Sequence, residues 1–311
     1  MLSRVAERMY WAGRYLERAE NTARLVRVHG NMLLDLPPKA GRSWEQLLTI
    51  FANQEDFAAR YERPDEVSVV NFFIADTDNP GSVLASLACL RENIRTTRDI
   101  VPTEGWECTN ELYLTARREL PRAGPDRIRH RRLTEVISRC QELTGILAGT
   151  MSHGPGYQFL RLGGNLERAD MTTRVLDVPA ASLLHLPEEL APFRFTLWMN
   201  VLKSLSAYQM YCQYVRRRIV GEEVIDFLLL DPQFPRSVRH CLAEMAASLQ
   251  HLPRHAEAVS AVEALVGEVE EAMDARLDVA ALHECLDRLQ LLLGALHRQI
   301  RKTWFLLAGE Q

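Results

Sequence analysis

Lysine, long apolar stretches and excess positive charge are all scarce or missing in this sequence. Only three of the 37 basic residues are lysines, and the 41 acidic residues leave a net charge of −4. A chain without an excess of positive charge lacks the usual character of a nucleic-acid-binding protein. Apolar stretches such as residues 289–296 are far shorter than the roughly 20 residues of a membrane-spanning helix. Because Arg4, Glu7 and Arg8 interrupt the first turns, no signal peptide is indicated either.

Patterns that hold metals, nucleotides or nucleophiles are missing as well. The six cysteines are scattered singly, without a C-x-x-C pair, which is typical of reduced thiols. His251 and His255 have the i,i+4 spacing of a metal pair, but Pro253 between them disfavours a regular helix. The chain has no phosphate-binding loop, dinucleotide fingerprint or nucleophile elbow. We therefore expect a cytoplasmic protein with no metal, no cofactor, and no contact with nucleic acid or membrane.

Apolar residues recur at three- and four-residue spacing almost throughout the chain, which predicts an all-α fold. Residues 67–74, VSVVNFFI, have the strongest β-propensity, but we predict a helix there because residues 224–231, which resemble them, are rich in leucine. Asn79 followed by Pro80 predicts a helix start at Pro80. The other predicted helices span about 3–34, 43–61, 80–99, 103–120, 131–151, 157–176, 192–220, 235–250, 255–273 and 279–307.

Part of the sequence repeats after about 150 residues. GRYLERAENTARL at residues 13–25 shares seven of 13 positions with GGNLERADMTTRV at residues 163–175, where unrelated segments would share roughly one. A second match, between residues 69–87 and 224–242, follows in the same order with a shift of 155. Matches in the same order indicate two homologous halves that arose by duplication.

We therefore predict one domain over residues 1–311, an internally duplicated helical bundle with pseudo-twofold symmetry. Its halves span about 1–125 and 151–275, and long helices without a counterpart follow at the C-terminus. A repeat of this length is far longer than a solenoid unit, so we expect two copies packed about one axis.

Each copy of the LERA helix carries charges beside an apolar stripe. The stripes run from Met9 to Val26 and from Phe159 to Leu176 and are predicted to lie in the core. Charges on an exposed helix face are interchangeable at a cost of about half a kcal/mol, so exposure gives little reason for both copies to keep them in register. We therefore expect these charges to be enclosed.

Two roles remain open for the enclosed charges. In one, Glu and Arg of each half clamp neighbouring helices, and the repeated Gly13 and Gly163 allow the helices to approach closely. In the other, the two helices meet near the axis and line a cleft for a zwitterionic or anionic ligand, because guanidinium binds carboxylate and phosphate in a bidentate manner. Arg236, which replaces Gly81 of the first half, is the asymmetric candidate for such a ligand.

Three long segments, LSRVAERMYWAGRYLERAENTARL, FLRLGGNLERADMTTRVLD and DFLLLDPQFPRSVRHCL, resemble the bacterial alpha-E family over essentially the whole chain. Members of that family are typically encoded beside circularly permuted ATP-grasp proteins and transglutaminase-like peptidases. The resemblance implies an ATP-grasp protein as partner and a role beside an amide-bond-forming ligase that makes or modifies a small peptide.

Carried over residue by residue, the resemblance gives the candidate site. The sequence departs from the family pattern at Gly164, which stands where the first half has Arg14. A symmetric ligand clamp is therefore in doubt at this position. The best candidates for acid–base catalysis are Glu17 and Glu167. The predicted ligand-binding residues, with Arg236 added, are Arg14, Arg18, Asn21, Arg24, Arg168, Asp170, Arg174 and Arg236.

Three functions are compatible with these residues. The first is an accessory subunit that binds an ATP-grasp ligase or presents its peptide or amino-acid substrate. The second is an enzyme in which Glu17 or Glu167 acts as general acid or base and arginines hold a carboxylate or phosphate. The third is a purely structural scaffold.

Overall fold

The computed structural model describes residues 1–35, 43–122, 126–184, 193–216, 218–274 and 279–306. Within these ranges the chain forms fourteen α-helices and no strand, as the apolar periodicity predicted. None of the described helices is both long enough and apolar enough to cross a membrane.

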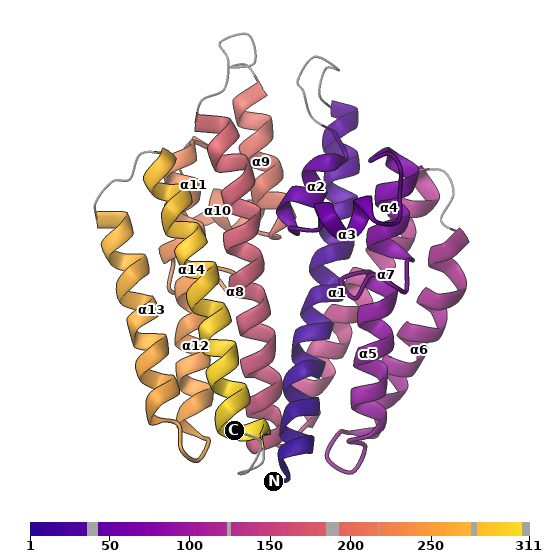
Figure 1. Cartoon of the computed structure of the whole chain (residues 1–311), viewed down its shortest axis with the longest axis vertical. Helices are drawn as coiled ribbons and strands as arrows, with labels where there is room; N and C mark the ends of the chain where they lie inside the picture. The colour runs from indigo at the N-terminus through magenta and orange to yellow at the C-terminus, as the bar shows by residue number, and fades with distance from the viewer. Residues whose placement is uncertain (36–42, 123–125, 185–192, 217, 275–278, 307–311) are drawn as a thin grey trace.

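Two long helices, α1 (Ser3–Asp35) and α8 (Pro155–Leu184), lie side by side at the centre of the bundle (Figure 1). Their predicted apolar stripes are buried, from Met9 to Val26 in α1 and from Phe159 to Leu176 in α8. The two backbones touch at the repeated glycines. An added Cβ would lie 2.0 Å from the carbonyl oxygen of Leu160 at Gly13, and 2.0 Å from that of Tyr10 at Gly163. Glycine is therefore required at both positions.

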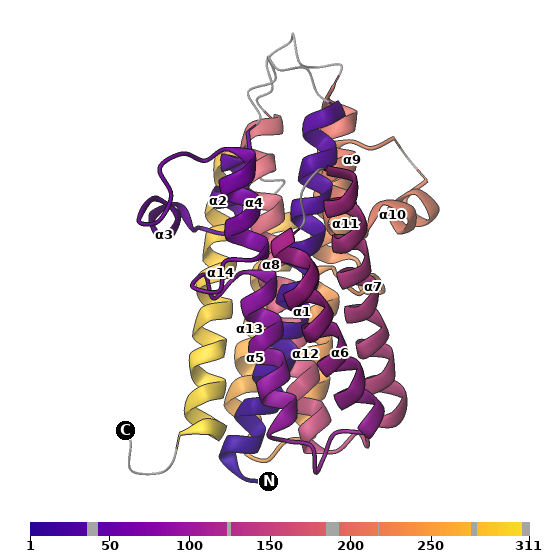
Figure 2. The same cartoon turned by 90° about the vertical axis from the view of Figure 1, so that its right-hand side faces the viewer.

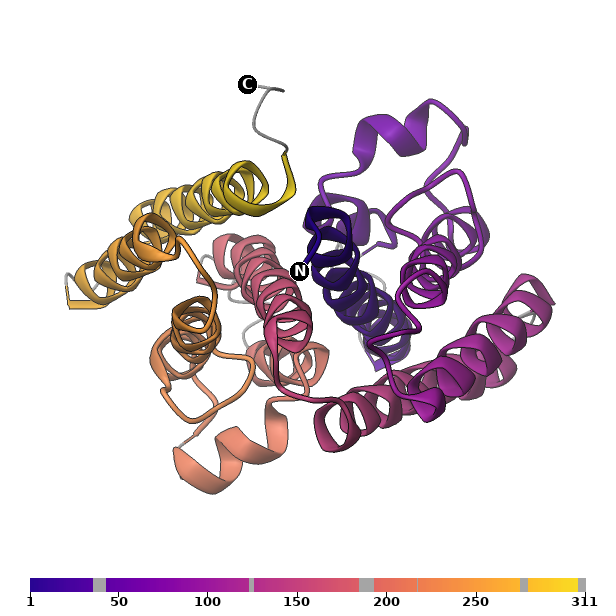
Figure 3. The ribbon, with the colours of Figure 1, turned by 90° about the horizontal axis from the view of Figure 1, so that it is seen from below.

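Long helices cover the outer side of each central helix, as the view from below shows (Figure 3). On one side α5 (Val83–Arg95) and α7 (Asp126–Thr150) pack against α1, and α6 (Thr103–Glu119) packs against both of them. On the other side α12 (Val238–Gln250) and α14 (Val279–Ile300) pack against α8, and α13 (Ala256–Asp274) packs against both.

Shorter helices gather at one end of the bundle, and α3 and α10 project from it in opposite directions (Figure 2). Two of them link the two sides of the bundle, because α2 packs against α8, while α9 packs against α1. These helices are α2 (Glu45–Ile50), α3 (Gln54–Ala58), α4 (Glu66–Ile74), α9 (Arg194–Ser204), α10 (Tyr208–Tyr214) and α11 (Gly221–Leu230).

The helix predicted at residues 67–74 is confirmed as α4, but the predictions of continuous helices over 43–61 and 192–220 are wrong. Each of these two segments is broken by a residue with positive φ, Ala52 at 51° and Ser206 at 53°. A left-handed residue turns the chain out of the helix, so each segment forms separate short helices.

Helix starts predicted at Pro80 and at residue 235 are also wrong. The N-caps are Ser82 and Ser237, whose hydroxyl oxygens accept hydrogen bonds from the backbone N–H groups of Ala85 and His240. Asn79 instead holds the preceding turn, since its side chain donates to the carbonyl of Phe72 over 2.8 Å. A serine hydroxyl accepts a hydrogen bond from a free N–H group of the first helical turn. Proline has no backbone N–H of its own, but it cannot satisfy those of its neighbours.

Candidate functional site

Two reciprocal ion pairs join the central helices. Nε of Arg18 on α1 donates to Oε1 of Glu167 on α8 over 2.6 Å. Nη2 of Arg168 on α8 donates to Oε2 of Glu17 on α1 over 2.7 Å. The four repeated residues thus lie on adjacent helices, as predicted, with each guanidinium bound to the carboxylate of the other helix.

Glu167 is the centre of the first cluster. Its Oε2 accepts from Nε of Arg14 over 2.6 Å and from Nη2 of Arg18 over 3.0 Å. Burial alone would raise the pKa of the Glu167 carboxyl, but Arg18 and Arg14 outweigh burial and lower it to about 2. The group is therefore a fixed anion at neutral pH.

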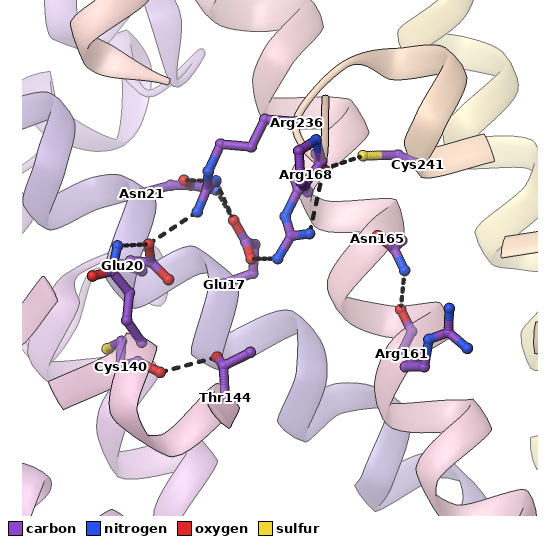
Figure 4. Close-up of polar contacts among 12 residues, drawn as sticks. Glu17, Glu20, Asn21, Cys140, Thr144, Arg161, Asn165, Arg168, Arg236 and Cys241 are labelled. Carbon is purple, nitrogen blue, oxygen red and sulfur yellow. Dashed lines mark hydrogen bonds and ion pairs between the residues drawn. The ribbon is translucent and has the colours of Figure 1, made fainter. Parts of the chain in front are cut away.

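Glu17 is the centre of the second cluster, drawn in Figure 4. Besides Arg168 at Oε2, its Oε1 accepts from Nη1 of Arg236 over 2.5 Å and from Nδ2 of Asn21 over 3.1 Å. Burial works to raise the pKa of Glu17, and Arg168 and Arg236 outweigh it, so the pKa lies well below its ordinary range. Both candidate catalytic carboxylates are thus buried, ionised and bound to two arginines each.

Arg236 connects this cluster to a third carboxylate. Its Nη2 donates to Oε1 of Glu20 over 2.9 Å, and its Nη1 donates to Oδ1 of Asn21 over 2.9 Å. The buried Arg24 also binds Glu20 and Asn21. Burial and the neighbouring Arg236 lower the pKa of Arg24 to about 10. Three arginines, Arg24, Arg168 and Arg236, therefore face two glutamates in one enclosed network.

Asp170 and Arg174 pair with each other rather than with either cluster. Nε of Arg174 donates to Oδ2 of Asp170 over 2.9 Å, one turn apart on α8. No described hydrogen bond joins this pair to Glu17 or Glu167. The remaining predicted site residues divide between the two buried clusters.

A pocket of about 190 Å³ lies against the Glu17 cluster. Thr144 of α7 and Arg161 and Asn165 of α8 line it, and Figure 4 labels these three residues together with Glu17. Arg161 pairs with Glu244 of α12. The pocket is lined by residues of four helices, namely Gly13, Leu16, Glu17, Thr144, Leu147, Ala148, Tyr157, Leu160, Arg161, Gly164, Asn165, Arg168, His240 and Glu244.

Most of the lining residues were not predicted from the sequence, because Thr144 and Glu244 lie outside the matched segments and His240, inside one, is not a repeated residue. One signal was present. Gly164 stands where the repeat has Arg14, and it lines the pocket. A missing side chain inside an otherwise repeated charged motif marks a place where space is left.

Next to the Glu167 cluster, aromatic side chains pack closely together. The guanidinium of Arg14 lies 5.3 Å from the ring centre of Trp11, and Trp11 stacks on Tyr15 with ring centres 5.3 Å apart. The hydroxyl of Tyr10 bonds to Nδ1 of His297 on α14 over 2.8 Å. Burial and Arg14 lower the pKa of His297 to about 4, so this ring is neutral.

Among the described residues, one group could bring three metal ligands together. Ligand atoms of Asp177, His283 and Asp287 all lie within 4.8 Å of one another. His283 and Asp287 are exposed, and Nδ1 of His283 lies 2.5 Å from Oδ1 of Asp177. Exposed acidic groups are common without a metal, and we assign none here.

Comparison with known proteins gives a match to the Alpha-E family over residues 1–305, described as a predicted alpha-helical domain with a conserved ER motif. Uncharacterised proteins of Mycobacterium bovis and Mycobacterium tuberculosis are 25% identical over 272 residues. The matched region covers 80% of this chain but only 30% of each of these relatives. No solved structure matches the chain.

Proposed function

The chain belongs to the Alpha-E family, and we propose that it is an accessory protein that holds a small peptide or amino-acid derivative for an ATP-grasp-type, amide-bond-forming ligase. The observation that carries this proposal is the pocket of about 190 Å³ built against the Glu17 cluster. It combines an apolar wall with a few fixed polar groups, which is the usual character of a small-molecule site.

The electrostatics support binding over catalysis by the two glutamates. A general base works best when its pKa lies near the working pH. Arginines hold the pKa of Glu167 at about 2 and that of Glu17 below its ordinary range. Carboxylates held in this way accept a proton poorly at neutral pH, but they orient hydrogen-bond donors well.

The ligase partner is proposed from the resemblance to a family that is encoded beside ATP-grasp proteins. The mycobacterial relatives add one supporting fact. Since the match covers 30% of each relative, a region similar to this chain is joined there to a longer polypeptide. A fold that is covalently joined to other protein in its relatives suits a role beside a partner.

We also infer that the two halves are copies related by a pseudo-twofold axis between α1 and α8. The reciprocal pairs of Arg18 with Glu167 and Arg168 with Glu17 support this inference. So do the two equal glycine contacts, Gly13 with Leu160 and Gly163 with Tyr10. Under this inference the clusters are the two versions of one ancestral site.

Purification of the tagged full chain from its native host, followed by mass spectrometry, tests the partnership. We expect an ATP-grasp protein to be retained and amide-bond formation by that protein to require the chain. ATP turnover by the purified chain alone, abolished by Glu17→Gln, would favour the enzyme instead. The variant Gly164→Leu fills the pocket, and Gly145→Ala on the open face of α7 is its control. Full ligase activity with the Gly164→Leu chain would favour the purely structural scaffold.

A further inference from the structure

The pocket lies where the second LERA helix lacks bulky side chains that the first one has. Gly164 stands in the place of Arg14, and a Cβ added there would meet one atom outside its own helix turn within 4 Å, the carbonyl oxygen of Gly13 at 3.7 Å. With the same shift of 150 residues, Arg161 stands in the place of Trp11, whose ring packs beside Arg14. Open space and one guanidinium group therefore replace a packed arginine and tryptophan.

Two arginines of α8 line this space and have donors that no protein group uses. Arg161 and Arg168 are seven residues apart and so lie on the same face of the helix (Figure 4). The described bond of the Arg161 side chain runs from Nη2 to Glu244, and 29% of this side chain is exposed. Nε of Arg168 has no partner among the described residues, whereas Nε of its counterpart Arg18 binds Glu167 over 2.6 Å. Both guanidinium groups can therefore donate to a ligand.

The charge beside the pocket favours an anionic ligand. The three arginines of the Glu17 network exceed its two glutamates by one. Even with its pKa lowered to about 10, Arg24 stays charged at neutral pH. Arg161 and Glu244 balance each other, so the network and the pocket together carry a surplus of one positive charge. An unbalanced charge is costly in an enclosed region, and a ligand with a single negative charge would balance it.

We propose that the pocket binds the free carboxylate of a small organic acid, held by the guanidinium groups of Arg161 and Arg168. A planar carboxylate matches the donor geometry of a guanidinium group. The carbon atoms of the same molecule pack on the apolar wall of Leu16, Leu147 and Leu160. This inference rests on the proposed function for the rest of the ligand, and it assigns the carboxylate of the amino acid or peptide as the group that is recognised.

Calorimetric titration of the purified full chain with two matched probes tests the inference. N-acetyl-leucine carries the carboxylate, and N-acetyl-leucine amide has nearly the same shape without the charge. We expect the acid to bind about tenfold more tightly than the amide, because hydrogen bonds between charged groups are stronger than those to a neutral amide. Equal affinity, or no binding of the acid at millimolar concentration, would overturn the proposal. Tighter binding of inorganic phosphate than of N-acetyl-leucine would also overturn it, because phosphate cannot use the apolar wall.

Substitutions at the outer ion pair locate the carboxylate. Arg161→Met should weaken binding of the acid about tenfold and leave binding of the amide within about twofold. The control is Arg139→Met, which breaks a partly exposed pair with Glu142 on α7 outside the pocket and should change neither affinity. Glu244→Gln removes the carboxylate that competes for Arg161 and should tighten binding of the acid.

The Glu244→Gln variant keeps the proposal testable if Arg161→Met does not fold. Unchanged binding of the acid by a folded Arg161→Met chain, or unchanged or weaker binding by Glu244→Gln, would overturn the assignment. These titrations contain no ligase. Failure to co-purify a ligase would therefore refute only the proposed partnership, and equal binding of the acid and the amide would refute only the recognition of a carboxylate.

Discussion

A single methyl group on the contact face of α8 should push the two central helices apart. In Gly163→Ala the new Cβ would lie 2.0 Å from the carbonyl oxygen of Tyr10, whereas real Cβ contacts are essentially never closer than 3.0 Å. The helices must therefore separate by about an ångström, because the clashing atom belongs to a backbone and cannot rotate away. The neighbouring Gly164→Ala places its methyl group 3.7 Å from the nearest atom outside its own helix turn, the carbonyl oxygen of Gly13, and serves as the matched control.

The two alanine variants should differ clearly in their free energies of unfolding. Overpacking of a core contact costs about 1–3 kcal/mol, and the upper end applies here because backbone meets backbone. Alanine in a helix interior returns about 1 kcal/mol relative to glycine. Gly163→Ala should therefore lose about 2 kcal/mol and Gly164→Ala should gain up to about 1 kcal/mol, a difference of about 3 kcal/mol.

Urea unfolding followed by circular dichroism measures this difference, provided that the slopes of the two transitions agree. The same experiment on Gly13→Ala should reproduce the loss, because its Cβ would meet the oxygen of Leu160 at the same 2.0 Å. If Gly163→Ala and Gly164→Ala unfold within about 0.5 kcal/mol of each other, the close contact of α1 and α8 does not exist as described.

Three further predictions follow from the buried charges and the caps. Arginines lower the pKa of Glu167 from 4.5 to about 2. Its ionisation therefore contributes roughly 3 kcal/mol to the free energy of unfolding above pH 4.5, and this contribution is lost as the pH falls toward 2. Urea unfolding at pH 6 and at pH 3 would detect the loss. Arg168→Met should cost about 3 kcal/mol by removing a donor from a buried carboxylate, while Arg174→Met, from the more exposed pair, should cost less than about 1 kcal/mol in the same assay. Replacing the cap serines, in Ser82→Ala and Ser237→Ala, should each cost about 1 kcal/mol, and equal stability to the unmodified chain would exclude their capping role.

Periodicity predicted the helices and their buried faces, but it could not predict where two of them break. Ala52 and Ser206 adopt positive φ, which glycine or asparagine signals in a sequence and alanine or serine does not. The helix starts predicted from proline were wrong for a related reason. It marks a region where helices begin, while the first helical residue is set by the side chain that caps the free N–H groups, here Ser82 and Ser237.

The charge clusters were predictable because the sequence contains them twice. Repetition of Glu17 and Arg18 as Glu167 and Arg168 gave both the enclosure and the neighbouring helices. The pocket was not predictable in the same way, since its shape depends on how four helices leave space between them. His240 and Glu244 reach it from α12; His240 lies within the second matched segment but has Ala85 as its counterpart, and Glu244 lies beyond that segment.

Two differences between the matching sequence segments compensate each other. Where the first half has Arg14 and Gly81, the second has Gly164 and Arg236, so each buried carboxylate still binds two guanidinium groups. Arg236 approaches Glu17 at Oε1 and is not among the described residues that line the pocket. The exchange therefore keeps the neutralising charge that a buried carboxylate requires, while it leaves position 164 without a side chain beside the pocket. A purely structural clamp needs no open space beside Glu17, whereas the proposed binding site uses the space that Gly164 leaves.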